Sequence, residues 1–355
     1  MKKSLVALAA LATVATSAQA QSSVTIYGVM DMGFGSVNGI GASDQRISGI
    51  QNGGLSTSRI GFKGTEDLGG GLSAGFTLET EILGDTGEQG KSPAVLFERG
   101  AFVTLGSASL GSISLGRQNY DEYATGVAFD PFGGNNIGGW IAQAQYGSAR
   151  FNNGITVKTA SFNGFGLTYQ HVFGEVAGDT SKGSAYSIGA NYASGPFAAA
   201  VITSRSNDAT TGNKVGQNTA VYAKYNAGFA DFRAGYVGLK TYHASTGATT
   251  KDQKGYFVGA VVPVNANVNV LAIATQYKDF GGVDNNRDPK GYALGATYSL
   301  SKRTTLYAIT AKSSQDNDSA LNVVSTSKWG SATNPTAPSA GNNQTAYTVG
   351  IRHTF

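Results

Sequence analysis

The sequence predicts an all-β fold, a sixteen-stranded antiparallel transmembrane β-barrel. Three observations predict it. Apolar and polar side chains alternate with a period of two over most of the chain. The connections between these stretches are short and long in strict alternation. After Ala20, no stretch is apolar over the roughly 20 residues that a membrane helix requires, so strands would have to cross the membrane.

The composition is typical of strands joined by many turns. The 355 residues include 50 glycines, 17 tyrosines and 17 phenylalanines; aromatic residues favour strands and glycine favours turns. The absence of cysteine excludes disulfides and thiolate metal sites. His171, His243 and His353 lack metal-ligand spacing, so we expect neither a metal nor another cofactor.

The N-terminus has the pattern of a secretory signal peptide over residues 1–20. A basic start precedes a short apolar run, and Ala18-Gln19-Ala20 is a small-x-small cleavage site. We therefore expect the mature barrel to span residues 21–355. Cleavage lowers the number of basic residues from 26 to 24, against 22 acidic ones, and the formal net charge from +4 to +2. Such a small net charge, without a basic cluster, predicts no nucleic-acid partner.

The last strand-like stretch illustrates the alternation. One face is mostly apolar and carries aromatic residues, and the other is small, polar or charged. The first face consists of Tyr347, Val349, Ile351, His353 and Phe355, and the second of Thr348, Gly350, Arg352 and Thr354. A soluble β-sandwich would show similar alternation, so the connections must distinguish the two architectures.

Seven connections are short and eight are long. The short ones lie near residues 66–71, 106–111, 162–166, 193–197, 226–231, 263–267 and 300–304. The long ones lie near residues 36–56, 84–96, 118–145, 173–184, 206–218, 241–254, 279–290 and 313–344. Together they join sixteen strands. Because the first and last connections are long, both termini are expected on the side of the short turns.

This layout is typical of outer-membrane barrels, which have short periplasmic turns and longer extracellular loops. In hydrocarbon every backbone N–H and C=O needs a partner, so the sheet must close and leave no edge. A sixteen-stranded barrel is too wide for side chains to fill, so its lumen holds water. The sequence therefore predicts a pore.

Five motifs in order resemble those of a known family. They are Gln21-Ser22-Ser23-Val24-Thr25-Ile26-Tyr27-Gly28 with Asp31, Ser58-Arg59-Ile60-Gly61-Phe62-Lys63-Gly64-Thr65-Glu66-Asp67-Leu68-Gly69, Leu115-Gly116-Arg117-Gln118, Asp130-Pro131-Phe132-Gly133-Gly134, and Gly350-Ile351-Arg352-His353-Thr354-Phe355. This set resembles the Gram-negative outer-membrane general porins of the β-proteobacterial type, found in Burkholderia, Neisseria and Comamonas. The resemblance extends from the first strand to the last.

The resemblance implies a passive diffusion channel for small hydrophilic solutes and ions in the outer membrane. It implies a homotrimer in contact with outer-membrane lipid and lipopolysaccharide. It also implies that the third long loop folds into the lumen, and that assembly machinery reads the terminal strand ending in Phe355. No enzymatic activity is implied.

The third long loop is the first candidate for function, because loops of roughly thirty residues are usually functional or disordered. Its apolar residues, such as Phe132 and Trp140, would be unusual on an exposed loop and are expected to pack inside the lumen. It also carries three carboxylates, Asp121, Glu122 and Asp130.

Arginines form the second candidate. By the family match, Arg59 and Arg99 point into the lumen opposite the third loop, and Arg150 has a similar context. Arg117, at the end of the strand before the loop, is counted with them. Alternation supports the inward direction of Arg59, because Ile60 and Phe62 fall on the other face. Alternation also predicts that Arg99 points inward, with Gly100 and Phe102 on the opposite face. An arginine facing lipid would cost about 2–4 kcal/mol at mid-depth.

These groups predict a charged constriction in which wall arginines face loop carboxylates and sort ions by the field between them. We expect weak anion selectivity. Enterobacterial members of the family place a lysine where this chain has Val29, so one fixed positive charge of the family pattern is absent.

Three alternatives remain at this point. A substrate-specific channel would show saturable current. An adhesion barrel would show no conductance. A barrel enzyme is suggested only by Gly71-Leu72-Ser73-Ala74-Gly75, a Gly-x-Ser-x-Gly match that lacks the required strand–turn–helix context.

Overall fold

The structure of the protein is a computed structural model that describes residues 23–90, 95–134, 137, 139, 149–324 and 337–355. The predicted signal peptide and Trp140 lie outside these residues. The elements are β1 (Ser23–Ile40), β2 (Gln45–Asn52), β3 (Arg59–Gly69), β4 (Leu72–Glu81), β5 (Gly100–Ser107), β6 (Gly111–Asn119), α2 (Asp121–Phe129), β7 (Arg150–Thr159), β8 (Phe165–Val172), β9 (Ala185–Ser194), β10 (Phe197–Asn207), β11 (Lys214–Asn226), β12 (Asp231–Tyr242), β13 (Thr249–Pro263), β14 (Val268–Lys278), β15 (Lys290–Ser299), β16 (Thr304–Ser314) and β17 (Gln344–Thr354). None of the helices described here is both long and apolar enough to cross a membrane.

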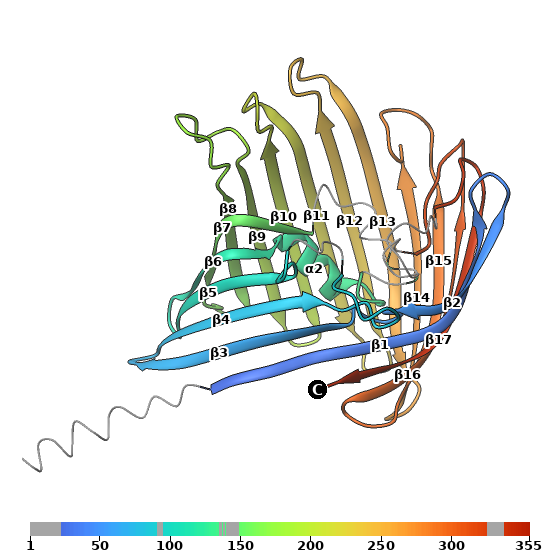
Figure 1. The fold of residues 1–355 in the computed structure, drawn as a ribbon, viewed down its shortest axis with the longest axis horizontal. Helices are drawn as coiled ribbons and strands as arrows, with labels where there is room; N and C mark the ends of the chain where they lie inside the picture. The colour runs from blue at the N-terminus through green and yellow to red at the C-terminus, as the bar shows by residue number, and fades with distance from the viewer. Residues whose placement is uncertain (1–22, 91–94, 135–136, 138, 140–148, 325–336) are drawn as a thin grey trace, which may run out of the picture.

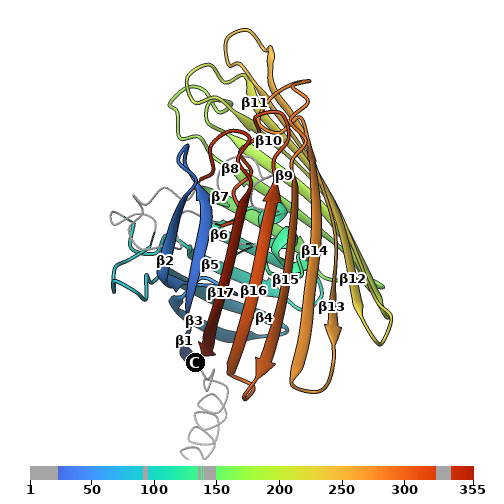
Figure 2. The same ribbon diagram turned by 90° about the vertical axis from the view of Figure 1, so that its right-hand side faces the viewer.

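The strands form one closed antiparallel ring (Figures 1 and 2). From β3 onwards each strand pairs with the next, and β1 pairs with both β3 and β17. β2 pairs with the half of β1 that lies beyond β3, so β2 and β3 are two segments of one barrel strand. The predicted sixteen-stranded barrel is thus confirmed. Phe355 completes the ring, because its N–H donates to the Gly28 carbonyl at 3.1 Å and its carbonyl accepts from the Gly28 N–H at 3.0 Å.

The predicted first long loop at 36–56 is wrong. β1 continues to Ile40, a tight turn follows, and β2 returns from Gln45. The ends of these strands carry polar side chains on their outer face, where Ser36 pairs with Ser48, so the apolar alternation expected of a strand in lipid stops before the strand does. For the same reason the loops predicted at 206–218 and 241–254 are shorter than expected, since β10 ends at Asn207 and β12 at Tyr242.

The break between β2 and β3 is organised around Asp31 of β1, which is fully buried. Its Oδ1 accepts from the Gly54 N–H at 3.0 Å, and its Oδ2 accepts from the N–H groups of Leu55 at 3.0 Å and Ser56 at 2.7 Å. The Tyr307 hydroxyl on β16 donates to Oδ1 at 2.7 Å. One carboxylate therefore satisfies three backbone donors that the interrupted strand leaves unpaired.

The two faces of the barrel differ as the alternation predicts. On β11, Val221 is 46% exposed while the next residue, Tyr222, is 1% exposed. On β15, Leu294 is 55% exposed and its neighbour Ala293 is 6% exposed. Large apolar side chains exposed along the outer face are typical of a surface that contacts lipid.

A buried apolar cluster lies on the inner face. Phe129 and Phe132 pack in it with wall residues such as Ile202 of β10 and Ile273 of β14. Leu321 and Val323, from the connection between β16 and β17, join the same cluster. The hydrophobic core of this chain is therefore formed by connections packed against the wall. Figure 1 shows α2 on the concave side of the sheet, and α2 contacts β9, β10, β11 and β12.

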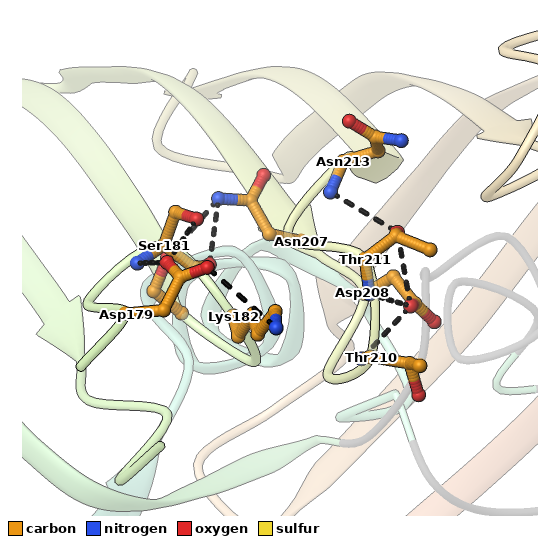
Figure 3. A network of polar contacts seen from close by, with 9 residues as sticks. Asp179, Ser181, Lys182, Asn207, Asp208, Thr210, Thr211 and Asn213 are labelled. Carbon is orange, nitrogen blue, oxygen red and sulfur yellow. Dashed lines mark hydrogen bonds and ion pairs between the residues drawn. The ribbon is translucent and has the colours of Figure 1, made fainter. Parts of the chain in front are cut away.

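Two neighbouring long connections are linked at the rim (Figure 3). The Asn207 side chain donates to the Ser181 carbonyl at 3.2 Å, and the Gly183 N–H donates to the Asp208 carbonyl at 3.1 Å. Asp208 also accepts from the Thr211 N–H at 2.7 Å within its own turn. These bonds hold the two connections against each other above β8–β11.

We expect Asp31→Ala to lower the free energy of unfolding by about 3 kcal/mol, because it leaves several buried donors without an acceptor. Urea unfolding of the refolded barrel, followed by tryptophan fluorescence, measures the change. Tyr307→Phe is the graded control, since it removes only one of the bonds to Asp31 and should cost less. A loss for Asp31→Ala no larger than that for Tyr307→Phe would contradict the role of this carboxylate.

Candidate pore constriction

Glu79 of β4 is the centre of the charged group on the inner wall. Its Oε1 lies 2.6 Å from Arg99 Nε, and its Oε2 lies 3.6 Å from Arg59 Nε. The Tyr27 hydroxyl on β1 donates to Oε2 at 3.0 Å. One carboxylate thus joins side chains from β1, β3 and the segment before β5. A Lys63 ammonium lies 5.2 Å from the centre of the Tyr27 ring and extends the group along the wall.

Arg59 points inward because of the strand register. It is the first residue of β3, and Ile60 and Phe62 lie on the opposite face of that strand. Phe62 pairs with Ile26, which is 58% exposed on the outer face, so Arg59 lies on the inner face. Arg59 Nη1 also donates to the Thr57 carbonyl at 3.0 Å, inside the segment that Asp31 holds. The break in the second barrel strand therefore helps to orient this guanidinium.

Arg99 reaches the same carboxylate for a reason other than the predicted one. Gly100 and Phe102 were predicted on the outer face by alternation, but Gly100 pairs with Glu79 and so shares its inner face. Arg99 lies in the bend before β5, outside the regular strand, and its side chain turns back to Glu79.

Arg150 of β7 extends the group toward α2. Its Nε donates to the Arg99 carbonyl at 2.9 Å, and its guanidinium lies 5.7 Å from the centre of the Tyr123 ring. Burial raises the pKa of Tyr123, and the positive charges of Arg150, Arg99 and Arg59 lower it. The Tyr123 side chain of α2 is therefore within electrostatic reach of all three arginines.

Arg117 does not join this group. The regular register of β5 and β6 pairs it with Ala101, on the face where Leu115 and Val103 are about half exposed. Its Nε donates to the Glu98 carbonyl at 2.6 Å, and Nη1 bonds the Asn152 side chain. This arginine lies on the outer face near the end of its strand, where the cost of facing outward is small.

The loop carboxylates are directed at other parts of the wall. Glu122 accepts from the hydroxyls of Ser204 at 2.9 Å and Ser187 at 3.3 Å, on β10 and β9. The Asp121 N–H donates to the Gln170 side chain at 2.8 Å on β8. The described structure therefore does not place these carboxylates opposite the arginines. The Glu122 carboxylate and the Asp121 backbone N–H hold α2 against the wall.

Asp130, at the end of α2, is also buried. Its Oδ1 accepts from the Phe132 N–H at 2.7 Å, and its carbonyl accepts from Arg233 Nη1 of β12 at 3.1 Å. Among the residues that the structure describes, none makes a hydrogen bond to Oδ2. Burial raises the pKa of Asp130 to about 7, although the Phe132 N–H and the Arg233 charge act in the opposite direction.

Glu79, Tyr27 and Tyr123 belong to this charged group but were not among the residues predicted for it from the sequence. The alternation of β4 could have indicated Glu79, because Leu78 and Phe76 on the neighbouring positions are apolar and outward-facing. Nothing local indicates that Tyr123 approaches Arg150, since that contact depends on how α2 packs.

Comparison with known proteins places these features in a family. A family model described as Gram-negative porin matches residues 7–318. Outer membrane porin protein 32 of Delftia acidovorans is 34% identical, with 100% of each chain covered. An outer membrane porin protein of Bordetella pertussis is 30% identical over 87% of this chain and 93% of its own length. The solved anion-selective porin from Comamonas acidovorans superimposes with a TM-score of 0.80 at 29% identity, covering 94% of this chain and 100% of that one.

A closed barrel with an apolar outer face and a charged inner wall defines a pore-forming protein of the outer membrane. The chain belongs to the Gram-negative porin family, whose members are diffusion channels and not enzymes. The Gly-x-Ser-x-Gly match agrees, because Ser73 lies within β4 and no helix follows it.

The raised pKa of Asp130 predicts that docking of α2 depends on pH. The protonated carboxyl favours the docked state, so this contribution is complete below the ordinary pKa of 3.8 and is lost as the pH rises through about 7. Hydrogen-exchange protection factors of amides in α2 should fall between about pH 4 and pH 7, by up to about tenfold per unit of pH, and should level off above pH 7.

Asp130→Asn keeps the size of the side chain and removes its titration. The variant should lose the pH dependence between about pH 4 and pH 7 that Asp130 supplies. Equal dependence in the variant and the wild type would assign the effect to another group, such as Glu122, whose pKa burial also raises.

Proposed function

We propose that this general-diffusion porin narrows at the group formed by Arg59, Arg99, Arg150 and Glu79, and that it weakly prefers anions. The distribution of burial on the inner wall carries the proposal. Six inner carboxylates are buried: Asp31, Glu81, Glu98, Asp121, Glu122 and Asp130. The inner cations differ in accessibility: Arg59 is 26% exposed at its side chain and Lys63 and Lys158 are exposed, whereas Arg99 is 12% exposed at its side chain and Arg150 is buried.

Accessible charge acts on a permeating ion more strongly than buried charge, because the ion can approach it more closely. Arginine stays protonated at any physiological pH. The accessible inner wall therefore presents more fixed positive than negative charge, which attracts anions into the lumen. The pairing of Arg59 and Arg99 with Glu79 limits this field, so the preference is weak.

The position of α2 supports a narrowing at this level by the third connection. The helix bonds the wall at β9 and β10 through Glu122, and its Tyr123 lies over Arg150 at the start of β7. An inner wall lined on one side by arginines and on the other by α2 leaves a smaller path for solutes than the bare barrel.

A substrate-specific channel remains the second candidate. The similar protein from Comamonas acidovorans is an anion-selective porin, which favours a preference by charge in this chain over recognition of one solute. A linear current–voltage relation that does not saturate with salt supports general diffusion, and competitive block by one class of solute would support specificity.

We also propose a signal peptide over residues 1–20, a homotrimer, lipopolysaccharide as the outer-leaflet partner, and recognition of the terminal strand by the assembly machinery. The outer-membrane protein OmpT of Vibrio cholerae, which shares the fold at 14% identity, has been solved in a trimer form. Phe355 supports the last proposal, because its backbone pairs with Gly28 at the seam where the barrel closes.

Replacing Arg59 and Arg99 together by serine should raise the single-channel conductance and lower the chloride-to-potassium permeability ratio by about twofold, because two fixed positive charges leave the lumen. Reversal potentials in a potassium chloride gradient measure the ratio. The matched control is Arg117→Ser with Arg205→Ser, which removes two arginines from the outer face and should change neither quantity. An unchanged reversal potential in the inner variant would contradict a charged constriction at Arg59 and Arg99.

A further inference from the structure

The outer face carries two levels of aromatic side chains. The level near the short turns contains Phe165, Phe197, Tyr225, Phe232, Tyr298 and Phe355, all more than a third exposed. The level toward the long connections contains Tyr186, Tyr256, Tyr292 and Tyr347, which are also exposed. Aromatic rings collect at the two water–lipid interfaces of a barrel, so the second level marks the outer interface.

Basic side chains lie at and just beyond this second level. We name them the cationic belt; its members are Arg46, Arg205, Lys240, Lys254, Lys278, Lys290 and Lys312. Strand register places each on the outer face. Lys254 and Lys290 lie two residues beyond Tyr256 and Tyr292, and Lys312 pairs directly with Tyr292.

Arg205 and Arg46, at the two ends of the belt, lie beside tyrosines of the second aromatic level. Arg205 pairs with Tyr186 on β9. The Nη2 of Arg46 donates to the Tyr347 hydroxyl at 2.8 Å, and its Nε donates to the Ser36 hydroxyl at 2.7 Å. Arg46 is therefore held in a fixed orientation by neutral hydroxyl groups.

Several charges of the belt lack a counter-charge. Lys240 pairs with Asp252 at 2.9 Å, and Lys278 pairs with Asp288. Within the described residues, Lys254, Lys290 and Lys312 form no ion pair. In addition, Lys254 stands directly opposite Lys278 across β13 and β14. Like charges in direct opposition destabilise a sheet. Asp288 counters the charge of Lys278, so Lys254 is the member of this opposed pair that an external anion would neutralise.

The belt is confined to one part of the wall. It occupies strands β10 and β12–β16, together with β2. On the outer face of β3–β9, as far as the structure describes it, Arg117 is the one lysine or arginine. Basic residues are therefore not a general feature of the upper rim.

We propose that the cationic belt binds the phosphate groups of the outer-leaflet glycolipid, with Lys254, Lys290 and Lys312 as the principal contacts. This inference rests on lipopolysaccharide as the proposed lipid partner and assigns residues to it. Exposed ammonium groups at the headgroup level attract anionic lipid headgroups, and the attraction adds over several cations. The row of tyrosines beneath them holds the acyl-chain boundary at a fixed height, so the phosphates and the ammonium groups meet at one level.

The test uses the refolded full barrel in detergent and purified lipid A as the probe. The variant Lys254→Gln/Lys290→Gln/Lys312→Gln is compared with Lys63→Gln/Lys158→Gln/Lys224→Gln, which removes the same charge from the inner wall. Native mass spectrometry measures lipid binding to each. We expect the belt variant to bind lipid A at least about tenfold more weakly, and the inner variant to bind it like the wild type. Lipid A without phosphates should bind the wild type as weakly as intact lipid A binds the belt variant.

Equal binding of intact lipid A by the wild type and the belt variant would overturn the assignment, and so would tight binding of lipid A without phosphates. If the wild type binds neither lipid, lipopolysaccharide is not a partner, and the proposed role of the cationic belt is also contradicted. Conductance of the same preparations is a separate readout. It should be unchanged in the belt variant, and it reports on the pore whichever lipid result is found.

Discussion

The structure depends on one constraint: each backbone donor and acceptor of a strand in hydrocarbon must find a partner in the neighbouring strand. The constraint is met because β1 pairs with β3 on one side and β17 on the other, and because Phe355 bonds Gly28 at the seam. Closure of the sheet turns one of its faces toward lipid and the other toward an enclosed, aqueous space. The period-two alternation of the sequence is the direct result.

Charged groups on the enclosed face need hydrogen-bond or ion-pair partners, although, among the described residues, no continuous hydrophobic core fills the barrel. Local pairing supplies some of these partners, as when Glu79 binds Arg59 and Arg99. Others come from connections folded onto the wall, where Glu122 of α2 bonds two serines and apolar residues form a buried cluster. Most inner carboxylates are buried in these contacts, so the accessible charge of the lumen is mostly positive.

Much of this could be predicted from the sequence, because alternation and turn length are local properties. The number of strands, the two faces and the inward direction of Arg59 follow from them. The first connection could not be predicted correctly, since its two strands are polar beyond the membrane and its break is held by Asp31, more than twenty residues away. The partners of Glu122 lie 65 and 82 residues along the chain, so no local pattern indicates them.

Planar-bilayer recording of the wild-type protein in a potassium chloride gradient shows whether the barrel conducts as a general-diffusion pore. We predict discrete, ohmic conductance steps that grow in proportion to salt concentration, with a reversal potential displaced modestly toward that of chloride. Absence of conductance would contradict a pore. A current that saturates at low solute concentration would contradict general diffusion.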